Sequence, residues 1–175
     1  MAFSINTTRT NAGGWKAAKM RKTILGSTDV ENGDATPNTI TNPGENTLMA
    51  ALPADLRAVL KPITKYTDNV GEGSESAVAV SASIDYLPLM AEFEVFGVRT
   101  KANPKEKNYQ AQYEYYKSGN SNIKYKQNDV ASKAAWWLRS PFFNFSDAFC
   151  RATTNGMVDD YNAITSGGVA PVFLV

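Results

Sequence analysis

Hydrophobic positions gather most densely in two blocks near the end of the chain. The first is Trp136-Trp137-Leu138, and the second runs over residues 169–175. Each block is short and lies between polar or glycine-rich segments, which predicts buried strands at 136–141 and 169–175. The stretch between them follows neither helical nor strand periodicity, and it carries aromatic and charged residues among Ser, Thr, Asn and Gly. Aromatic rings on such segments are common in binding loops.

Helical spacing first occurs after Gly13-Gly14. Ala17, Met20 and Ile24 recur at i, i+3 and i+7, which predicts a helix that stops at Gly26. We interpret the basic residues of this segment as a solvated helix face, because the net charge of the chain is only +1. These residues are Lys16, Lys19, Arg21 and Lys22.

Three later segments also have signals for short elements. Residues 47–60 have an apolar face, and Pro53 is expected to split a short turn at 47–51 from the helix that follows. Three tyrosines at i, i+4 and i+7 predict a helix with one aromatic face; they are Tyr109, Tyr113 and Tyr116. Residues 92–96 predict a short turn of helix or a strand that ends at Gly97.

The last third of the chain also contains a hairpin signal. Asn155-Gly156 predicts a two-residue turn between strands at 149–154 and 157–160. Alternation along these strands is expected to place Phe149 and Val158 inward. With the helices, these elements predict an α+β fold: a small, twisted, mostly antiparallel sheet with two to three helices and long loops. At 175 residues, the whole chain 1–175 is expected to form one domain.

The segment 142–165 is the candidate ligand-binding region. If it forms loops on this sheet, its outward residues combine an aromatic cluster with Arg and Asp, the composition of an interface hot spot. The alternative is that the rings are core residues beneath a loop. The predicted site residues are Phe142, Phe143, Phe145, Asp147, Arg151, Thr153, Asp159, Tyr161, Ile164 and Thr165.

The amino-acid composition excludes several kinds of catalytic and metal-binding site. The chain has no histidine and a single cysteine, Cys150, which excludes Ser-His-Asp and Cys-His nucleophilic sites, the usual zinc sites and an intrachain disulfide. No phosphate-binding or dinucleotide-binding motif is present. We therefore expect a protein that is not an enzyme and has no cofactor and no metal. Cys150 is interpreted as an inert buried thiol, and Glu92 and Glu94 have no catalytic partner near them in sequence.

The net charge and the hydropathy of the chain also limit the classes of partner that it is expected to bind. A net charge of +1 gives no reason to expect nucleic acid. No apolar run approaches the ~20 residues needed to cross a bilayer, so no membrane partner is expected. The first ten residues are polar and do not resemble a secretory signal.

Several motifs carry a family resemblance. The run WWLRSP, a later FC, then NG and a terminal GVAP-F resemble the C-terminal signature of a bacterial and phage domain family of unknown function. That family resembles the C-type-lectin-like variable proteins of diversity-generating retroelements. Further similar blocks extend over nearly the whole chain: GGWKAAKMRK at 13–22, LPADLRAVLKPI at 52–63, AEFEVFG at 91–97 and QYEYYKSGNSNIKY at 112–125.

The resemblance implies a C-type-lectin-like fold in which the first strand pairs with the last. It also implies that 142–165 is a variable surface, since a reverse transcriptase rewrites asparagine codons of such proteins at adenines. The partner would be a protein or cell-surface receptor, and the protein would lie on a phage tail or a bacterial cell surface. The calcium-ligand motifs of sugar-binding C-type lectins are missing.

The resemblance also gives a frame for that surface. Trp136, Leu138, Arg139, Gly168 and Pro171 would be its fixed residues, with Arg139 as a buried or half-buried polar bridge. The alternative function is a phage structural module, a tail or decoration protein, that uses the same loops for contacts in a homo-oligomer.

Overall fold

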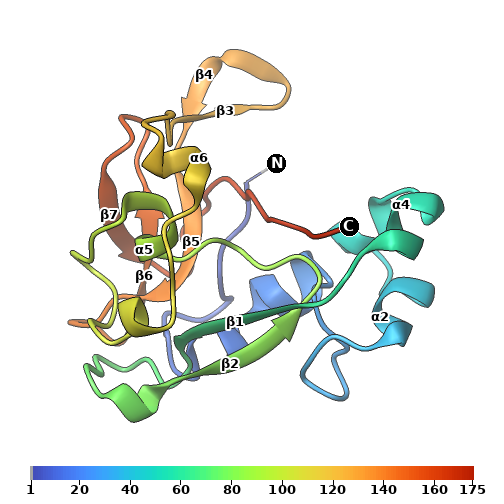
Figure 1. Ribbon diagram of the computed structural model, residues 1–175, viewed down its shortest axis with the longest axis horizontal. Helices are drawn as coiled ribbons and strands as arrows, with labels where there is room; N and C mark the ends of the chain where they lie inside the picture. The colour runs from blue at the N-terminus through green and yellow to red at the C-terminus, as the bar shows by residue number, and fades with distance from the viewer. Residues whose placement is uncertain (1) are drawn as a thin grey trace.

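Three small antiparallel sheets carry the strands of the computed structural model, which describes residues 2–175 (Figure 1). The α+β prediction is confirmed. The sheets are formed by β1 (Ile63–Asp68) with β2 (Val80–Asp85), by β3 (Lys124–Lys126) with β4 (Asp129–Ala134), and by β5 (Trp136–Pro141), β6 (Ala148–Ala152) and β7 (Val158–Asn162) in that order.

The α-helices of the described residues are only four to six residues long. Within the described residues they are α1 (Gly14–Ala17), α2 (Pro37–Thr41), α3 (Leu48–Ala51), α4 (Ala54–Val59), α5 (Glu92–Phe96) and α6 (Glu114–Lys117), with a π-helical turn at Met20–Ile24 and 3₁₀ turns at Ala77–Ala79 and Glu106–Asn108. Helices this short are not stable alone, so tertiary packing must hold them. The division at Pro53 and the stop at Gly97, whose φ is 68°, are confirmed.

The predicted tyrosine helix is wrong. The chain forms a 3₁₀ turn up to Asn108 and becomes α-helical only in α6, so the three tyrosines pack against different elements. Tyr109 stacks on Tyr66 with ring centroids 5.0 Å apart, while Tyr116 is buried. The tyrosines therefore contact separate partners and do not share the helix face that their spacing predicted.

The β5–β6–β7 sheet lies between two hydrophobic clusters. Trp137 and Phe149 belong to one cluster, and Trp136, Leu138 and Cys150 belong to the other. All six residues of β5 are buried, as predicted for 136–141. A strand that is covered on both faces reads as a continuous apolar run, which is why this block was recognisable.

Arg139 is the exception within that apolar strand, and it is fully buried. Its guanidinium donates to both carboxylate oxygens of Glu94, with Nη1–Oε2 at 2.5 Å and Nη2–Oε1 at 3.0 Å. It also donates to Thr67 Oγ1 at 2.6 Å and to the carbonyl of Leu89 at 2.8 Å. The polar-bridge prediction for Arg139 is confirmed, and the bridge joins β5 to α5 and β1.

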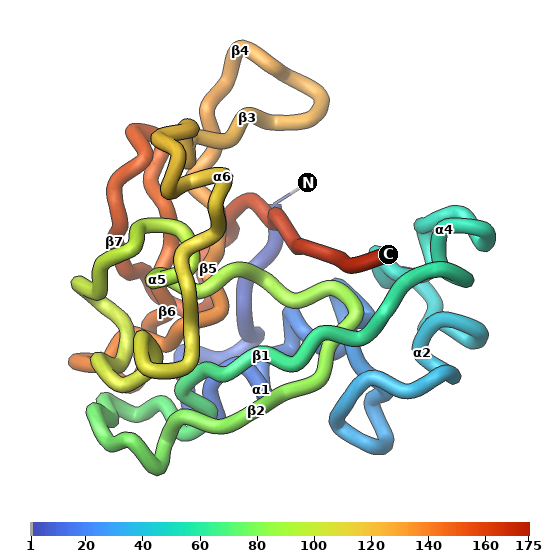
Figure 2. The backbone as a smooth tube through the Cα atoms, in the orientation of Figure 1, coloured from blue at the N-terminus to red at the C-terminus, as the bar shows by residue number. Residues whose placement is uncertain are grey.

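The N-terminal segment runs beside the C-terminal part of the chain (Figure 2). Phe3 and Gly167 exchange backbone hydrogen bonds of 2.9 and 3.0 Å, and the indole of Trp137 donates to the Phe3 carbonyl at 2.9 Å. Residues 169–175 do not form the predicted continuous strand. They make isolated bridges only, at Pro171 and Leu174, because proline has no N–H for a ladder.

Arg21 also departs from the prediction, because it is fully buried instead of lying on a solvated face. Its Nε donates to Asp85 Oδ1 at 2.6 Å, and its Nη2 lies 3.0 Å from Asp34. Trp15 Nε1 donates to the other oxygen of Asp85 at 3.2 Å. Residues 20–24 form a π-helical turn, so side chains leave at angles that α-helical spacing does not give.

Replacing Arg21 with methionine is expected to leave the Asp85 carboxylate buried and uncompensated. The loss of unfolding free energy should be about 3–5 kcal/mol. The matched change Lys22→Met, at the next residue, should cost about 0.5 kcal/mol or less. Urea unfolding of the two variants measures both values, and similar losses for both would contradict the buried position of Arg21.

Candidate functional site

The register of β6 and β7 determines which predicted site residues share a face. Phe149 lies opposite Tyr161, and Arg151 lies opposite Asp159, so these four side chains point to the same side of the sheet. Val158 lies opposite Ala152 and therefore points to the other side. The expectation that Phe149 and Val158 share an inward face is wrong, since residues of equal parity on a strand share a face.

The turn between these strands is a three-residue loop instead of the predicted two-residue one. The N–H of Gly156 donates to the Thr153 carbonyl at 3.0 Å, and the N–H of Thr153 donates to Met157 at 2.8 Å. Only Gly156 has a positive φ, of 76°, whereas a type I′ turn would also require one at Asn155. A Cβ at Gly156 would lie 2.2 Å from Asn122 Oδ1, so glycine is required there.

Arg151, Asp159 and Tyr161 form a contiguous patch on the sheet. Arg151 Nη2 lies 3.1 Å from Asp159 Oδ2, and its guanidinium carbon lies 4.0 Å from the centre of the Tyr161 ring. Tyr161 is 45% exposed. Among the described residues, Arg151 Nε has no hydrogen-bond partner, so the patch retains an unused donor.

The aromatic loop at 142–147 is built around Phe142, which is buried. The rings of Phe143 and Phe145 contact it edge-on at 5.5 and 5.3 Å. The guanidinium of Arg99 lies 4.1 Å from the centre of the Phe143 ring. Phe145 is 56% exposed and Phe143 is half-buried, so the loop presents mainly Phe145 while Phe142 supports both rings from below.

Asn11 holds this loop in place. Its Nδ2 donates to the carbonyls of Phe145 at 2.7 Å and Ala148 at 2.9 Å, and its backbone N–H donates to Ser146 at 2.7 Å. Its Oδ1 accepts from the N–H of Glu72 at 2.8 Å. Asn11 is fully buried. Because the carbonyls of the loop already have partners, the loop does not have to order when a ligand binds.

Asp147 connects the aromatic loop to the turn after β7. Its carboxylate accepts from Arg9 Nε at 2.7 Å and from Asn162 Nδ2 at 3.3 Å, and its carbonyl accepts from the N–H of Ala163 at 2.8 Å. Ile164, the next residue of that turn, is 49% exposed. Thr165 is half-buried, and its N–H donates to Asn162 at 2.9 Å.

The predicted residues therefore do not form one patch. Phe143, Phe145, Asp147 and Ile164 gather at one end of the sheet. Asn162, which donates to Asp147, follows Tyr161 and so connects them to the patch of Arg151, Asp159 and Tyr161. Thr153 follows the other end of β6, about 17 Å from Ala148 and about 7 Å from Arg151 at ~3.3 Å per residue. We call the predicted site residues other than Phe142 and Thr153 the sheet-end surface. They are Phe143, Phe145, Asp147, Arg151, Asp159, Tyr161, Ile164 and Thr165.

Sequence reasoning missed three charged residues of the sheet-end surface: Arg9, Arg99 and Lys101. Lys101 Nζ lies 2.7 Å from Asp160 and 5.0 Å from the centre of the Phe142 ring. Arg99 pairs with Glu75 at 3.1 Å. These residues come from loops far from 142–165 in sequence, so no local pattern could indicate them.

Two buried carboxylates beneath the surface have opposite pKa shifts. Burial opposes the charged form of Glu94, but Arg139 and Lys65 outweigh it and lower its pKa to about 2. Burial raises the pKa of Glu106 to about 7, against hydrogen bonds from the Asp68 N–H and the Ser140 hydroxyl. Both Glu94 and Glu92 have partners outside their own helix. Arg139 and Lys65 pair with Glu94. Glu92 accepts from the N–H groups of residues 100–102.

Cys150 is buried between the same elements. Burial raises the pKa of its thiol well above the usual value, with the Glu92 and Glu106 carboxylates adding to the effect. A protonated, buried thiol is a poor nucleophile. In residues 2–175 there is no cluster of three or more potential metal-ligating side chains, and no helix there is long and apolar enough to span a bilayer.

Comparison with known families gives one match. Residues 45–175 match the model described as Domain of unknown function (DUF6273). The chain belongs to this family. Neither the search of curated proteins nor that of solved structures found a match. Residues 1–44 lie outside the family match, yet they supply Asn11, Trp15 and Arg21 to the interior.

The opposite shifts of Glu94 and Glu106 predict a maximum of stability near pH 4.5. As pH falls toward 2, the unfolded chain gains a proton at position 94 before the native state does, so stability is lost. As pH rises from 4.5 to about 7, the unfolded chain loses a proton that native Glu106 retains, so stability is again lost, by about 3 kcal/mol. Urea unfolding across this range measures both limbs. Glu106→Gln should reduce the slope of the upper limb only, and Glu92, whose pKa burial also raises, contributes the remainder; an unchanged upper limb would contradict the assignment.

Deleting residues 1–44 is expected to prevent folding of the family-matched remainder. The deletion removes the Asn11 clamp, the Trp15 side chain and the partner of Asp85 together. Circular dichroism melting of residues 45–175 should show no cooperative transition, while the full chain melts cooperatively. A cooperative transition in the shortened chain would show that the first segment is dispensable.

Proposed function

We propose that this protein is a non-enzymatic binding protein that recognises a protein or cell-surface receptor through the sheet-end surface. One observation carries the proposal: the exposed ring of Phe145 stands on a loop that Asn11 fixes before any ligand is present, and a second exposed ring, that of Tyr161, stands on β7. Exposed rings among Arg and Asp residues have the composition of interface hot spots. Rigid presentation lowers the entropy cost of binding.

The arrangement also favours a surface that can vary. Phe145, Tyr161 and Ile164 are between 45% and 56% exposed, and their backbones belong to a loop, strand and turn held by residues elsewhere. Changes at these positions would alter the ligand without unfolding the core. We therefore propose a C-type-lectin-like scaffold diversified by a retroelement, on a phage tail or a bacterial cell surface. The resemblance of WWLRSP and GVAP-F and the pairing of Phe3 with Gly167 support it.

The DNA beside the gene tests the diversification directly. The proposal predicts a near-copy of the codons for 136–175, with mismatches at adenines, together with a reverse-transcriptase gene. The altered codons should include those of the exposed residues 145, 161 and 164. Mismatches in the codons for Trp136–Pro141, which are buried, would argue against a tolerant surface on a fixed frame.

The second candidate is a structural phage module in which the same residues form contacts in a homo-oligomer. The exposed Phe145 and Tyr161 side chains favour it equally, because oligomer interfaces bury aromatic residues. Sedimentation velocity separates the two functions. A monomer supports receptor recognition, whereas a stable oligomer that dissociates on Phe145→Asp supports the structural role.

Two phenylalanines four residues apart test the division between surface and frame. Phe145→Ala should reduce the unfolding free energy by less than about 1 kcal/mol, because the ring is 56% exposed. Phe149→Ala should reduce it by about 3–5 kcal/mol, because that ring is fully buried in the core. Chemical denaturation measures both losses. Equal losses would show that Phe145 belongs to the frame.

A further inference from the structure

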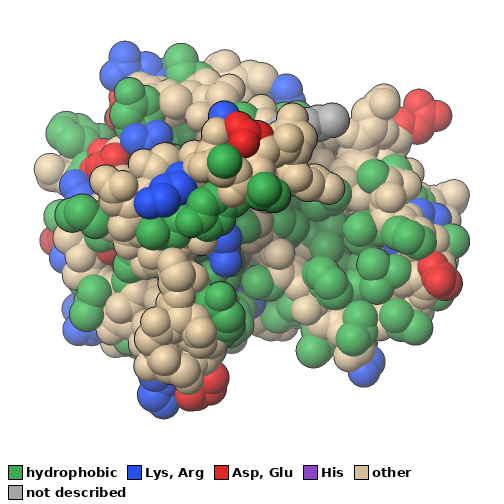
Figure 3. Space-filling model, turned by 90° about the horizontal axis from the view of Figure 1, so that it is seen from above, with side chains coloured by type: hydrophobic (Ala, Val, Ile, Leu, Met, Phe, Trp, Pro, Cys, Tyr) green, Lys and Arg blue, Asp and Glu red, His purple; other side chains and the backbone are tan. Residues whose placement is uncertain are grey.

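A second concave surface lies away from the sheet-end surface, where the β3–β4 hairpin projects from the rest of the molecule (Figure 1). A groove of about 600 Å³ runs between this hairpin and the segment 166–170. Ala134, Trp136, Val169 and Ala170 contribute apolar lining. Figure 3 views this face and shows hydrophobic side chains gathered around a hollow, with basic side chains beside it.

The charges of the groove have one sign. Lys124, Lys126 and Lys133 line it, and no Asp or Glu does. Within the part of the chain that the structure describes, none of the three forms an ion pair. Asp129, opposite Lys126 across the hairpin, offsets part of this charge, and the three lysines beside an apolar floor still leave a positive potential that favours an anionic ligand.

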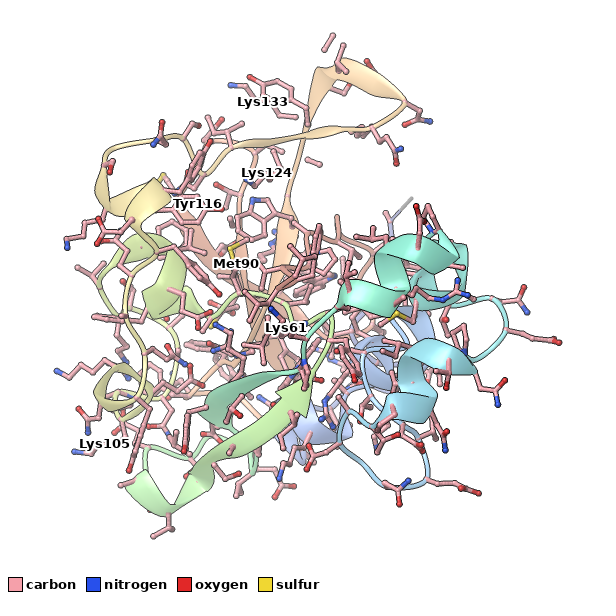
Figure 4. The ribbon with its side chains drawn as sticks, turned by 45° about the vertical axis from the view of Figure 1, so that its right-hand side comes forward. Lys61, Met90, Lys105, Tyr116, Lys124 and Lys133 are labelled. Atoms are coloured by element: carbon pink, nitrogen blue, oxygen red, sulfur yellow. The ribbon has the colours of Figure 1, made fainter. Side chains whose placement is uncertain are left out.

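Lys124 occupies an unusual position among them. Its Nζ lies 5.5 Å from the centre of the Tyr116 ring and 5.7 Å from those of Tyr115 and Trp136. Figure 4 shows it between the hairpin and Tyr116, with Lys133 further along β4. The rings stabilise the ammonium in part, but burial still lowers the pKa of Lys124. A carboxylate at this point would restore the interaction that desolvation removed.

The groove has a second lobe. A hollow of about 440 Å³, lined by Met90, Tyr116 and Val172 and bordered by the acidic residue Glu114, shares Lys124 and Ala170 with the first. The shared lysine therefore stands between two apolar hollows. A ligand that fills both must carry an acidic group with an apolar group on either side, as an extended peptide does when the acidic residue stands two positions from each apolar residue, because residues i, i+2 and i+4 share a face.

We propose that this two-lobed groove binds an extended acidic segment of a partner protein, with a carboxylate on Lys124 and apolar side chains in the two hollows. Lys126 and Lys133 would face a second acidic residue of the same segment. Nucleic acid fits the groove less well, because three lysines neutralise few phosphates and the chain as a whole carries only +1. The site is separate from the sheet-end surface and does not depend on its function.

An NMR titration tests the proposal with the full chain labelled with ¹⁵N. The probe is acetyl-Leu-Ser-Glu-Ser-Leu-Ser-Glu-amide at up to millimolar concentration, whose Leu and Glu side chains share one face when the peptide is extended. The amides of Lys124, Gly168 and Ala170 should shift, while those of the sheet-end surface should not. The variant Lys124→Gln/Lys126→Gln/Lys133→Gln should bind the peptide about tenfold more weakly.

The control variant Lys19→Gln/Lys105→Gln/Lys107→Gln removes the same charge from exposed positions outside the groove and should change the affinity less than about twofold. Since Lys124 packs against three rings, Lys126→Glu/Lys133→Glu is a second variant that leaves it in place and should also weaken binding. Equal weakening by both triple variants, no shifts in the native protein, or tighter binding of benzoate or oligothymidylate at the same amides would overturn the proposal.

Discussion

The buried pair of Arg139 and Glu94 is the interaction on which the rest of the structure depends. Both side chains are removed from water, and together they satisfy each other's charge through two hydrogen bonds. Loss of Glu94 would leave the Arg139 guanidinium buried without its carboxylate, at a cost of about 3–5 kcal/mol, whereas loss of Arg139 would leave Glu94 with Lys65 as its remaining counter-ion. The pair places a polar residue within the most apolar strand of the chain, so β5 can dock in only one register against α5 and β1.

The sheet-end surface follows from that frame in two steps. β6 pairs with β5 and carries β7, which brings Arg151 and Tyr161 to the surface. Asn11 then fixes the loop between β5 and β6 from the N-terminal segment. Because the second step depends on residues outside the family match, the first 44 residues complete the family domain in this chain instead of forming a separate unit. The exposed side chains on this surface are not needed to hold the fold together, and a recognition surface requires such residues.

Local signals predicted the parts of the fold that local physics determines. The six-residue strand β5 was visible as an apolar run, Pro53 divided two helices, and Gly97 ended α5. The strand β1 was missed, because Ile63–Asp68 is mostly polar and gains its partner from β2 some twenty residues later. The burial of Arg21 was missed for the same reason, since its partner Asp85 is remote in sequence.

The sequence predicted which residues of the candidate site are exposed better than it predicted their arrangement in space. Exposure of Phe145, Tyr161 and Ile164 agrees with their expected outward positions, whereas the structure buries Phe142 and moves Thr153 to the far end of β6. The turn at Asn155-Gly156 was recognised, but its length depends on the φ angle of Asn155, which the dipeptide alone does not determine.

Hydrogen exchange of backbone amides tests most directly whether the frame fixes the aromatic loop without a ligand. The N–H groups of Phe142 and Phe143 donate to Ala148 and Lys101, both at 3.0 Å. In the free protein, the account predicts protection at these amides close to that of β6. Exchange as fast as that of the exposed β3–β4 turn at 127–128 would show that the loop is not held in place, and would contradict a recognition surface formed in advance of its ligand.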